Sequence, residues 1–178
     1  MIILVRLGEL FNAEKLIPIT SAHISGISYK TLGDAPIEYL KALADSDAKV
    51  KVKTTLNPQS LDPTYLTKKV PNAFKQKQSE ILKQFNKMGV NESLTCTPYY
   101  LGKHKSGAHM AWAESSAVVY SNSVLGAWTN REGGPSALAA AIIGKTPEYG
   151  MHKPENRCST IQVNLRTKPQ NETDFGLL

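Results

Sequence analysis

The fold of this chain is decided by Trp112-Ala-Glu-Ser-Ser-Ala-Val-Val-Tyr-Ser-Asn-Ser-Val-Leu-Gly126 and by Asn130-Arg-Glu-Gly-Gly-Pro-Ser136, which follows shortly after. Residues 117–125 of the first stretch are compatible with either a strand or a helix. The second stretch predicts a helix over residues 136–143, because proline is favourable in a first helical turn and Gly144 can stop the helix.

The same region is dense in polar side chains that have few possible charge pairs: Glu114, Ser115, Ser116, Asn122, Ser123, Asn130, Arg131 and Glu132. They stand among small apolar residues. A buried polar group without a partner costs about 1–3 kcal/mol. The pattern therefore indicates a lined pocket, and the alternative is an ordinary capped helix and loop.

Outward from this region, predicted helices and strands alternate along the chain. We expect further helices over residues 37–44 and 64–88, the second ended by Gly89. We expect short strands over residues 16–20, 48–54, 94–97 and 159–165. This alternation predicts an α/β layered fold. Residues 1–178 contain no internal repeat or linker, so we expect one domain.

The positive charge of the chain is concentrated in the predicted long helix. Its core-facing positions follow three-four spacing: Phe74, Gln78, Ile81, Leu82, Phe85 and Met88. Its lysines mostly fall elsewhere and indicate a solvated face. The formal net charge of +6 suits a nucleic acid, an anionic small molecule or plain solubility. No aromatic interleaving or known module accompanies the charge, so we predict no nucleic-acid partner.

Length and composition suit a globular protein with a real core, since the chain has 178 residues and 41% hydrophobic residues. Arg6 and Glu9 interrupt the apolar start, so we expect no signal peptide. No apolar run is long enough to span a bilayer. Two cysteines do not make a disulfide framework. We therefore predict a cytoplasmic protein without a membrane partner.

Two polar segments, Thr20-Ser-Ala-His-Ile-Ser-Gly-Ile-Ser-Tyr29 and Thr54-Thr-Leu-Asn-Pro58, follow predicted strands. Loops at the carboxyl ends of strands are where open α/β sheets bind ligands, and small residues let backbone N–H groups approach an anion. The alternative is a turn with local hydroxyl caps. The segment Gly133-Gly-Pro-Ser136 is likewise either an anion site at a helix start or a simple cap.

Cys96 lies in Thr95-Cys-Thr-Pro-Tyr-Tyr100, before a predicted turn. A nucleophile paired with a histidine, a zinc ligand with His104 and His109, and a small buried hydrophobe are all compatible with this position. Cys158 lies beside a predicted strand and indicates a structural role.

Seven blocks, which occur in order along nearly the whole chain, together resemble the large subunit, or large catalytic domain, of the aconitase X family. They are Ile19-Thr-Ser-Ala-His-Ile-Ser-Gly-Ile-Ser-Tyr29, Gly33-Asp34, Thr54-Thr-Leu-Asn-Pro58, Cys96-Thr-Pro-Tyr99, Ala111-Trp-Ala-Glu-Ser-Ser-Ala-Val-Val-Tyr120, Asn122-Ser-Val-Leu-Gly126 and Thr129-Asn-Arg-Glu-Gly-Gly-Pro-Ser-Ala-Leu138. The resemblance implies a partial, aconitase-like three-layer α/β domain.

The resemblance also implies a hydro-lyase that holds an iron–sulfur cluster, 4Fe–4S in type, through three cysteines. Its open iron acts as a Lewis acid on the substrate hydroxyl. The archaeal branch dehydrates (R)-5-phosphomevalonate to trans-anhydromevalonate 5-phosphate in a modified mevalonate pathway, and a bacterial branch acts on cis-3-hydroxy-L-proline. A small subunit or fused small domain supplies a serine. The basic charge favours the phosphorylated, small anionic substrate.

Matched motif by motif, the resemblance assigns Cys96 as the first cluster ligand, and it places the other two cysteine ligands outside this chain. It assigns substrate contacts to Gly26, Ile27, Ser28, Asn57, Pro58, Glu114 and Ser115. It identifies no catalytic residue.

The sequence departs from the family pattern at several points. It stops at Asp174-Phe-Gly-Leu-Leu178, short of the family's large chain, which predicts an incomplete chain. Trp128 replaces a usual arginine, Ala108 a usual glutamate and Pro36 a usual glycine. Two interpretations stay open: part of an active lyase, completed by a further segment and the small subunit, or a non-catalytic remnant that binds an anion or a partner.

Overall fold

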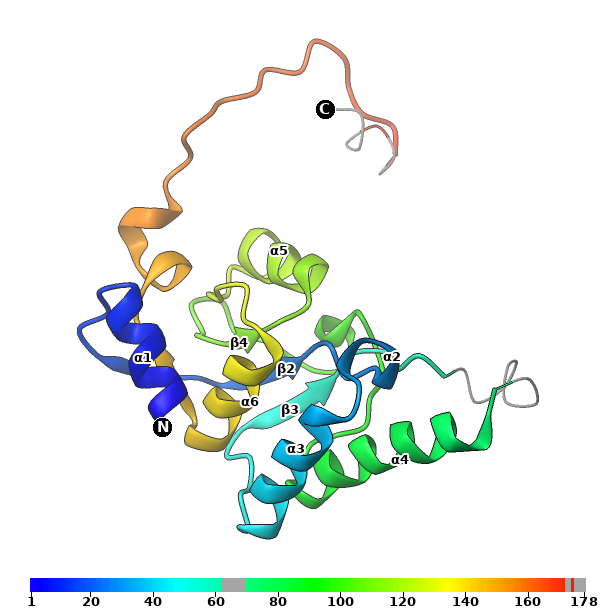
Figure 1. The fold of residues 1–178 in the computed structure, drawn as a ribbon. Helices are drawn as coiled ribbons and strands as arrows, with labels where there is room; N and C mark the ends of the chain where they lie inside the picture. Colours follow the sequence, from blue (N-terminus) through cyan, green and yellow to red (C-terminus); the bar gives the residue numbers. More distant parts are fainter. Residues whose placement is uncertain (62–69, 172–173, 175–178) are drawn as a thin grey trace.

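The centre of the molecule is a three-stranded sheet with the strand order β3-β2-β4. We describe residues 1–61, 70–171 and 174 in a computed structural model (Figure 1). The strands are β2 (Ser21–Ile24), β3 (Lys53–Leu56) and β4 (Ala111–Trp112), and both neighbours run parallel to β2. Their carboxyl ends therefore meet at one edge of the sheet.

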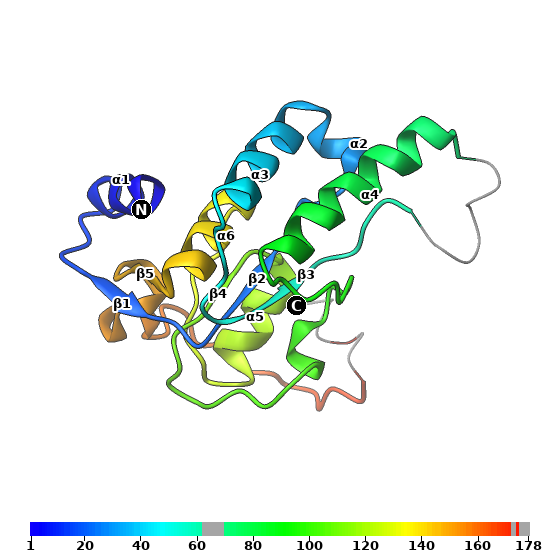
Figure 2. The same ribbon diagram turned by 90° about the horizontal axis from the view of Figure 1, so that it is seen from below.

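Helices cover both faces of this sheet (Figures 1 and 2). On one face lie α3 (Ala35–Asp45), α4 (Asn72–Lys87) and α6 (Gly134–Ile143), whose apolar side chains form the main core with Ile24 and Leu56. On the other face Trp112 packs with α5 (Ser115–Ser123) and with the 3-10 turn η1 (Pro98–Tyr100). These three layers confirm the α/β class predicted from the alternating pattern.

A smaller layer flanks the sheet beside α6. Helix α1 (Ile2–Leu10) buries Leu4 against the alanines of α6. Strands β1 (Leu16–Pro18) and β5 (Lys145–Pro147) form an antiparallel pair. Three short helices complete the elements that the structure describes: α2 (Tyr29–Leu32), η2 (Gly150–His152) and η3 (Pro154–Arg157).

The predicted helices are confirmed with small changes in their bounds. α3 and α6 match residues 37–44 and 136–143, and the ambiguous segment 117–125 is largely helical in α5. α4 begins at Asn72 after Pro71. Part of the longer predicted helix, residues 64–69, lies outside the described residues. Gly89 and Gly144 follow α4 and α6 with φ of +83° and +76°, where glycine is favoured.

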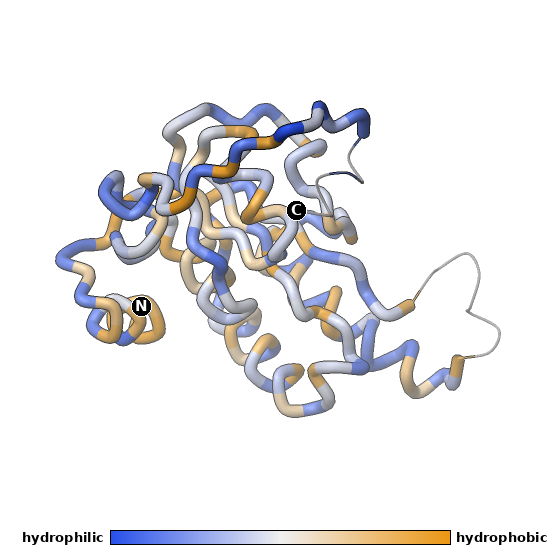
Figure 3. Tube along the Cα trace, turned by 90° about the horizontal axis from the view of Figure 1, so that it is seen from above, coloured by the Kyte–Doolittle hydropathy of each residue, from blue (hydrophilic) through white to orange (hydrophobic). Residues whose placement is uncertain are grey.

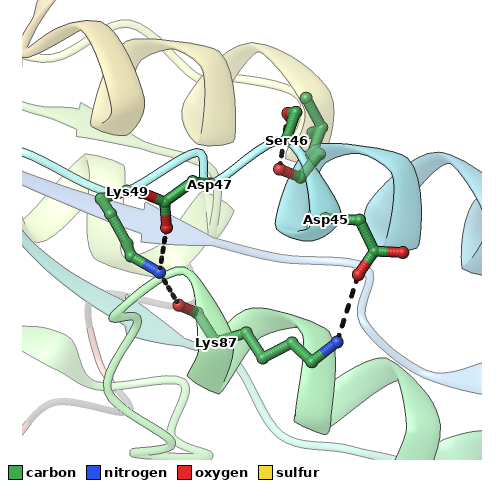
Figure 4. A network of polar contacts seen from close by, with 6 residues as sticks. Asp45, Ser46, Asp47, Lys49 and Lys87 are labelled. Atoms are coloured by element: carbon green, nitrogen blue, oxygen red, sulfur yellow. Dashed lines mark hydrogen bonds and ion pairs between the residues drawn. The ribbon is translucent and has the colours of Figure 1, made fainter.

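The lysines of α4 lie on its solvated face, as predicted, and one of them, Lys87, pairs with a carboxylate of α3. Lys87 Nζ lies 3.3 Å from Asp45 (Figure 4). Lys49 Nζ lies 2.9 Å from Asp47 and donates to the carbonyl oxygen of Lys87 at 2.9 Å. Exposed pairs of this kind contribute roughly 0–1 kcal/mol each, so they tie the helix ends together only weakly.

Three of the predicted strands are wrong or displaced. Residues 48–52 approach the sheet as irregular chain, and β3 occupies 53–56 instead. Leu94 has a left-handed backbone (φ +45°), so residues 94–97 turn rather than extend as a strand. Residues 159–165 alternate in hydropathy (Figure 3), but Ile161 is 78% exposed and this segment pairs with no strand in the described chain.

The serines and glycine of residues 20–29 predict a loop, but residues 21–24 form the central strand β2. Ser21 and His23 are both buried, and Trp112 Nε1 donates to Ser21 Oγ at 3.1 Å while His23 Nδ1 lies 2.8 Å from Thr55 Oγ1. These paired polar groups make the α5-side face of the sheet partly polar. No helix within the described ranges is long and apolar enough to cross a membrane.

Candidate functional site

Backbone hydrogen bonds connect the carboxyl ends of the three parallel strands. Asn57 N donates to Ile24 O at 3.0 Å, and Ala113 N donates to His23 O at 2.9 Å. Thr95 N donates to Leu56 O at 3.0 Å, which holds the segment before Cys96 beside β3. We call this region, with the loops that follow each strand, the carboxyl edge. It contains all the predicted site residues.

The loop after β2 carries the predicted substrate residues Gly26, Ile27 and Ser28. Gly26 is exposed with φ +78°, and Ser28 is half-buried and makes no side-chain hydrogen bond among the described residues. Ile27 is 1% exposed and packs in the main core, so its side chain is structural. The prediction of a ligand loop directly after a strand thus applies to residues 25–28.

A buried amide of α4 holds this loop in place. Gln78 is 1% exposed; its Nε2 donates to Ile27 O at 3.1 Å and its Oε1 accepts from Tyr29 N at 2.8 Å. The spacing of the helix predicts Gln78 only as one more position in a core-facing stripe. A glutamine among apolar neighbours at helical spacing was the available signal, but its partners, 49 and 51 residues away, were not visible.

Asn57 and Pro58 follow β3 at the same edge. Asn57 Oδ1 is buried and has no hydrogen-bond partner within the described chain, whereas Pro58 is exposed. A buried carbonyl oxygen without a donor is unfavourable by about 1–3 kcal/mol. Asn57 Oδ1 is therefore available to accept a hydrogen bond from a group outside the described residues.

Cys96 and Glu114 are brought into electrostatic contact although they lie far apart in sequence. The Cys96 thiol is exposed and free. Partial burial, and then the negative charge of Glu114, raise the pKa of this thiol above its ordinary value. The thiol therefore stays protonated until a cation or metal displaces the proton.

Glu114 and Ser115 stand where β4 leads into α5. Glu114 occupies the cap position of the helix, but its side chain makes no capping hydrogen bond. Ser115 begins the helix and is exposed. No hydrogen bond involves either side chain in the part of the molecule that is described, so a carboxylate and a hydroxyl remain available at the carboxyl edge.

The amino terminus of α6 lies beneath the β2 loop. A Cβ on Gly134 would stand 2.6 Å from Ser25 O, so only glycine permits this approach. The Ser136 hydroxyl accepts from Gly133 N at 3.0 Å and donates to Glu132 at 2.6 Å. The Gly133–Ser136 segment is therefore a helix cap, the second of its two predicted readings.

Three other polar residues of the opening stretch, Asn122, Asn130 and Glu132, are hydrogen-bonded within the fold instead of lining a pocket, whereas Ser116, Ser123 and Arg131 are exposed. Asn122 Nδ2 donates to the carbonyl oxygens of Val118 and Thr129, each at 2.9 Å. Asn122 Oδ1 accepts from Arg157 Nη1 at 2.7 Å. Asn130 Oδ1 accepts from Met151 N at 2.7 Å. The lined-pocket interpretation thus fails for this part of the stretch, because backbone groups satisfy these amides.

Glu132 is also satisfied inside the fold, by a separate pair of hydroxyl groups, and only 5% of its surface is exposed. Its carboxylate accepts from Ser136 at 2.6 Å and from Thr146 at 3.4 Å. Burial raises the pKa of Glu132, although both hydrogen bonds act in the opposite direction. We call the residues of this region whose side chains are hydrogen-bonded within the fold the buried network: Asn122, Thr129, Asn130 and Glu132.

The zinc and nucleophile alternatives for Cys96 gain no support. Within residues 1–61, 70–171 and 174, no cluster of three His, Cys, Asp or Glu side chains can hold a metal. His109 instead lies against His152, with 3.0 Å between their Nδ1 atoms. Cys158 is exposed rather than structural.

As a ligand to an iron–sulfur cluster, Cys96 fits in three respects: its thiol is free, exposed and placed at the carboxyl edge. Such clusters are held by cysteine thiolates. The second cysteine, Cys158, follows η3, while Cys96 stands beside β3. The described chain therefore offers one ligand of the expected kind at this edge.

The three departures from the family pattern lie outside the set of edge residues. Trp128 stacks beneath the Arg157 guanidinium, 4.5 Å from the ring centroid. Pro36 lines an apolar cavity of about 250 Å³ beside the Gly26 loop. Ala108 lines a second cavity at the opposite edge of the sheet.

Comparison with known proteins identifies the family. Residues 1–155 match the family described as "Aconitase X first domain". The phosphomevalonate dehydratase large subunit of Thermococcus kodakarensis is 50% identical over 179 residues, which cover 100% of this chain and 44% of that protein. The one of Methanocaldococcus jannaschii is 54% identical over 93% of this chain and 41% of that protein.

A more distant relative is the cis-3-hydroxy-L-proline dehydratase of Pseudomonas aeruginosa, 35% identical over 93% of this chain and 28% of that protein. The crystal structure of Thermococcus kodakaraensis aconitase X in its holo-form superposes with a TM-score of 0.79 at 53% identity, over 86% of this chain and 38% of that one. This chain spans less than half the length of these relatives. It belongs to the aconitase X family, as its sequence motifs indicate.

Proposed function

We propose that this chain is part of a hydro-lyase that dehydrates (R)-5-phosphomevalonate to trans-anhydromevalonate 5-phosphate in isoprenoid biosynthesis. The observation that carries the proposal is the carboxyl edge. The side chains of Ser28, Asn57, Glu114 and Ser115 follow the carboxyl ends of the parallel strands and make no hydrogen bond in the described chain, and the free thiol of Cys96 follows a segment bonded to the end of β3. The choice of substrate rests on the 50–54% identity to archaeal phosphomevalonate dehydratase large subunits, against 35% to hydroxyproline dehydratases.

The proposed roles follow from the chemistry of each group. Asn57 Oδ1 accepts a hydrogen bond from a substrate hydroxyl, which removes its unsatisfied state. Ser28 and Ser115 donate hydroxyl hydrogens to substrate oxygens, and the backbone of Gly26 and Ile27 approaches the ligand closely because Gly26 has no side chain. Pro58 shapes the turn after β3. Glu114 holds negative charge beside the thiol.

Cys96 would hold one iron of a 4Fe–4S cluster, with two further cysteine ligands supplied from outside this chain. When bound, the cluster supplies a Lewis acid for the leaving hydroxyl. A small subunit completes the site, in keeping with the "large subunit" in the names of the relatives. The proposed setting is a single partial domain of a cytoplasmic enzyme with no nucleic-acid partner.

The substrate is tested in the completed enzyme, meaning this chain joined to the C-terminal part of the Thermococcus large subunit and mixed with the small subunit. We expect turnover of 5-phosphomevalonate and none of cis-3-hydroxy-L-proline under the same conditions. Turnover of hydroxyproline alone would reverse the assignment. A cluster-loaded complex that turns over neither substrate would instead support the non-catalytic remnant.

The cluster is tested in the isolated chain. Cys96 supplies a single thiolate at the edge, so we expect anaerobic reconstitution to yield no stable, stoichiometric 4Fe–4S cluster on residues 1–178. Iron and sulfide analysis after desalting measures this. In the completed enzyme, Cys96→Ser should lower cluster content, while Cys158→Ser should leave it unchanged. Equal cluster content in the Cys96→Ser variant would remove Cys96 from the ligand set.

A further inference from the structure

The amino-terminal edge of the sheet, opposite the proposed substrate edge, contains a cavity of about 250 Å³. It lies where β2 and β3 begin, because Ser21 and Lys53 are register partners in the parallel pair. The loop before β4 closes its other side. The polar residues of its lining are Thr20, Ser21, Lys53, Lys103, His104 and Lys105.

The cavity concentrates positive charge without a counter-charge. Lys53, Lys103 and Lys105 line it, and no carboxylate does so among the described residues. Elsewhere the ion pairs of the described chain engage other lysines, including Lys77 with Asp34 and Lys87 with Asp45. These three ammonium groups lack such a partner in the part of the chain that is described, although together they repel one another.

A hydrogen bond to a backbone carbonyl oxygen holds one of these ammonium groups at the cavity wall. Lys53 Nζ donates to Leu101 O at 2.6 Å, and an ammonium group retains two further donors after one such bond. Gly102 gives this ammonium room, since a Cβ there would stand 2.8 Å from Nζ. The orientation of Lys53 is therefore set before any ligand arrives, which reduces the entropy lost on binding.

Uncharged groups of the lining also have unused capacity. Ser21 Oγ accepts a hydrogen bond from Trp112 Nε1, so its own hydroxyl hydrogen is free to donate. His104 Nε2 is buried and has no partner within the described ranges. Burial lowers the pKa of His104; a backbone hydrogen bond with Pro98 opposes this shift and the charge of Lys53 adds to it. A bound anion would favour the protonated, donating form.

We propose that this cavity binds a small tetrahedral oxyanion, such as inorganic phosphate or the phosphoryl group of a small phosphate ester. Three ammonium groups complement the charge of a dianion better than that of a ligand with a single carboxylate. The volume is below the roughly 300–1,000 Å³ of sites for drug-sized ligands, so the ligand is small. The site is separate from the proposed substrate edge, because the two lie at opposite ends of β2. A strand rises about 3.3 Å per residue.

The test is a titration of the ¹⁵N-labelled chain with sodium phosphate, followed by NMR at constant ionic strength maintained with chloride. Constant ionic strength removes general screening of the exposed lysines. We expect saturable shifts concentrated at residues 20–21, 53 and 102–108. Parallel titrations use glycerol 3-phosphate and acetate. Tighter binding of the ester identifies a phosphate monoester as the ligand, tighter binding of phosphate identifies the free anion, and both should exceed acetate at least tenfold.

Variants separate the cavity from general surface charge. Lys103→Ala/Lys105→Ala should weaken phosphate binding at least tenfold, whereas the matched double variant Lys75→Ala/Lys83→Ala, beside Glu80 on α4, should change it less than twofold. Ala108→Glu places a carboxylate at the cavity and should weaken binding at least tenfold. Ala108→Gln, of similar size and without charge, should change it less than threefold. Circular dichroism confirms that each variant is folded.

Two results would overturn the proposal. One is equal weakening by the α4 double variant, which would indicate diffuse attraction to any lysine. The other is shifts that do not saturate or that spread over α4 rather than residues 102–108. Neither result bears on the proposed dehydratase activity, which is measured with the completed enzyme at the other edge.

Discussion

The carboxyl edge and the buried network carry the same kinds of side chain but use them in opposite ways. The Asn122 side chain makes four hydrogen bonds to three residues, whereas Asn57 at the edge keeps a buried carbonyl oxygen with no hydrogen bond among the described residues. Glu132 accepts two side-chain hydrogen bonds, whereas Glu114 accepts none in that part of the chain. Polar residues serve stability where the chain satisfies them, and they are available for ligands where it does not.

The largest expected effect comes from removing a satisfied amide. Asn122→Ala leaves the Arg157 guanidinium, the Thr129 N–H and two carbonyl oxygens without this partner, so we expect a loss of about 3 kcal/mol in the free energy of unfolding. The matched variant Asn57→Ala removes an oxygen that has no partner in the described chain, so it relieves an unfavourable burial and should not lower the free energy of unfolding. Urea denaturation of both variants measures the difference. Equal losses would erase the distinction between the two regions.

The next effect in size is the loss of unfolding free energy that acid should cause through two buried histidines. Burial lowers the pKa of His23 from 6.5 to about 4, and burial with the nearby charges of His109 and Arg157 lowers that of His152 to about 4. The unfolded chain therefore binds more protons between pH 6.5 and 4, and the free energy of unfolding falls as pH drops through this window. The loss between pH 7 and 5 is about 2 kcal/mol for each histidine.

Glu132 opposes this acid effect. Burial raises its pKa, so the folded chain holds the Glu132 proton more tightly than the unfolded chain, and protonation as the pH falls through that raised pKa recovers stability. Urea denaturation at pH 7, 6 and 5 measures the sum. His23→Asn supplies a side-chain amide that can hydrogen-bond to Thr55 but cannot titrate in this range. It should reduce the loss of unfolding free energy between pH 7 and 5 by the amount expected for one histidine. A slope unchanged by this variant would show that His23 is not buried in its neutral form.

Sequence reasoning succeeded where local pattern and structure coincide. The core stripe of α4 and the glycine stops after α4 and α6 follow from spacing and backbone freedom alone. It failed at β2, because the serines and glycine of residues 20–29 indicate a loop unless Trp112 and Thr55, the cross-strand partners of Ser21 and His23, are known. Residues 159–165 have the alternation of a strand, but a strand also needs a neighbour, and pattern alone cannot supply one.

The candidate site was partly accessible from sequence for the same reason. Polar loops that follow strands predicted that ligand groups gather at a sheet edge, and the parallel order β3-β2-β4 brings those loops together. The individual assignments came from family resemblance. Sequence could not separate Glu114 from Glu132 within one polar stretch, since the difference depends on Ser136 and Thr146 reaching the second carboxylate and nothing reaching the first in the described chain.

The smallest expected effect in free energy is at the edge itself, and it should appear in activity rather than stability. In the completed enzyme, Glu114→Gln and Ser115→Ala should each lower kcat/KM at least tenfold, which is about 1.4 kcal/mol of transition-state stabilisation. The melting temperature should stay within about 2 °C, because neither side chain has a hydrogen-bond partner to lose in the described chain. Ser116→Ala, one exposed position further along α5, is the control and should alter neither quantity. If Glu114→Gln instead lowers the melting temperature while activity per folded molecule is intact, Glu114 belongs with the buried network, and the carboxyl edge loses its charged ligand group.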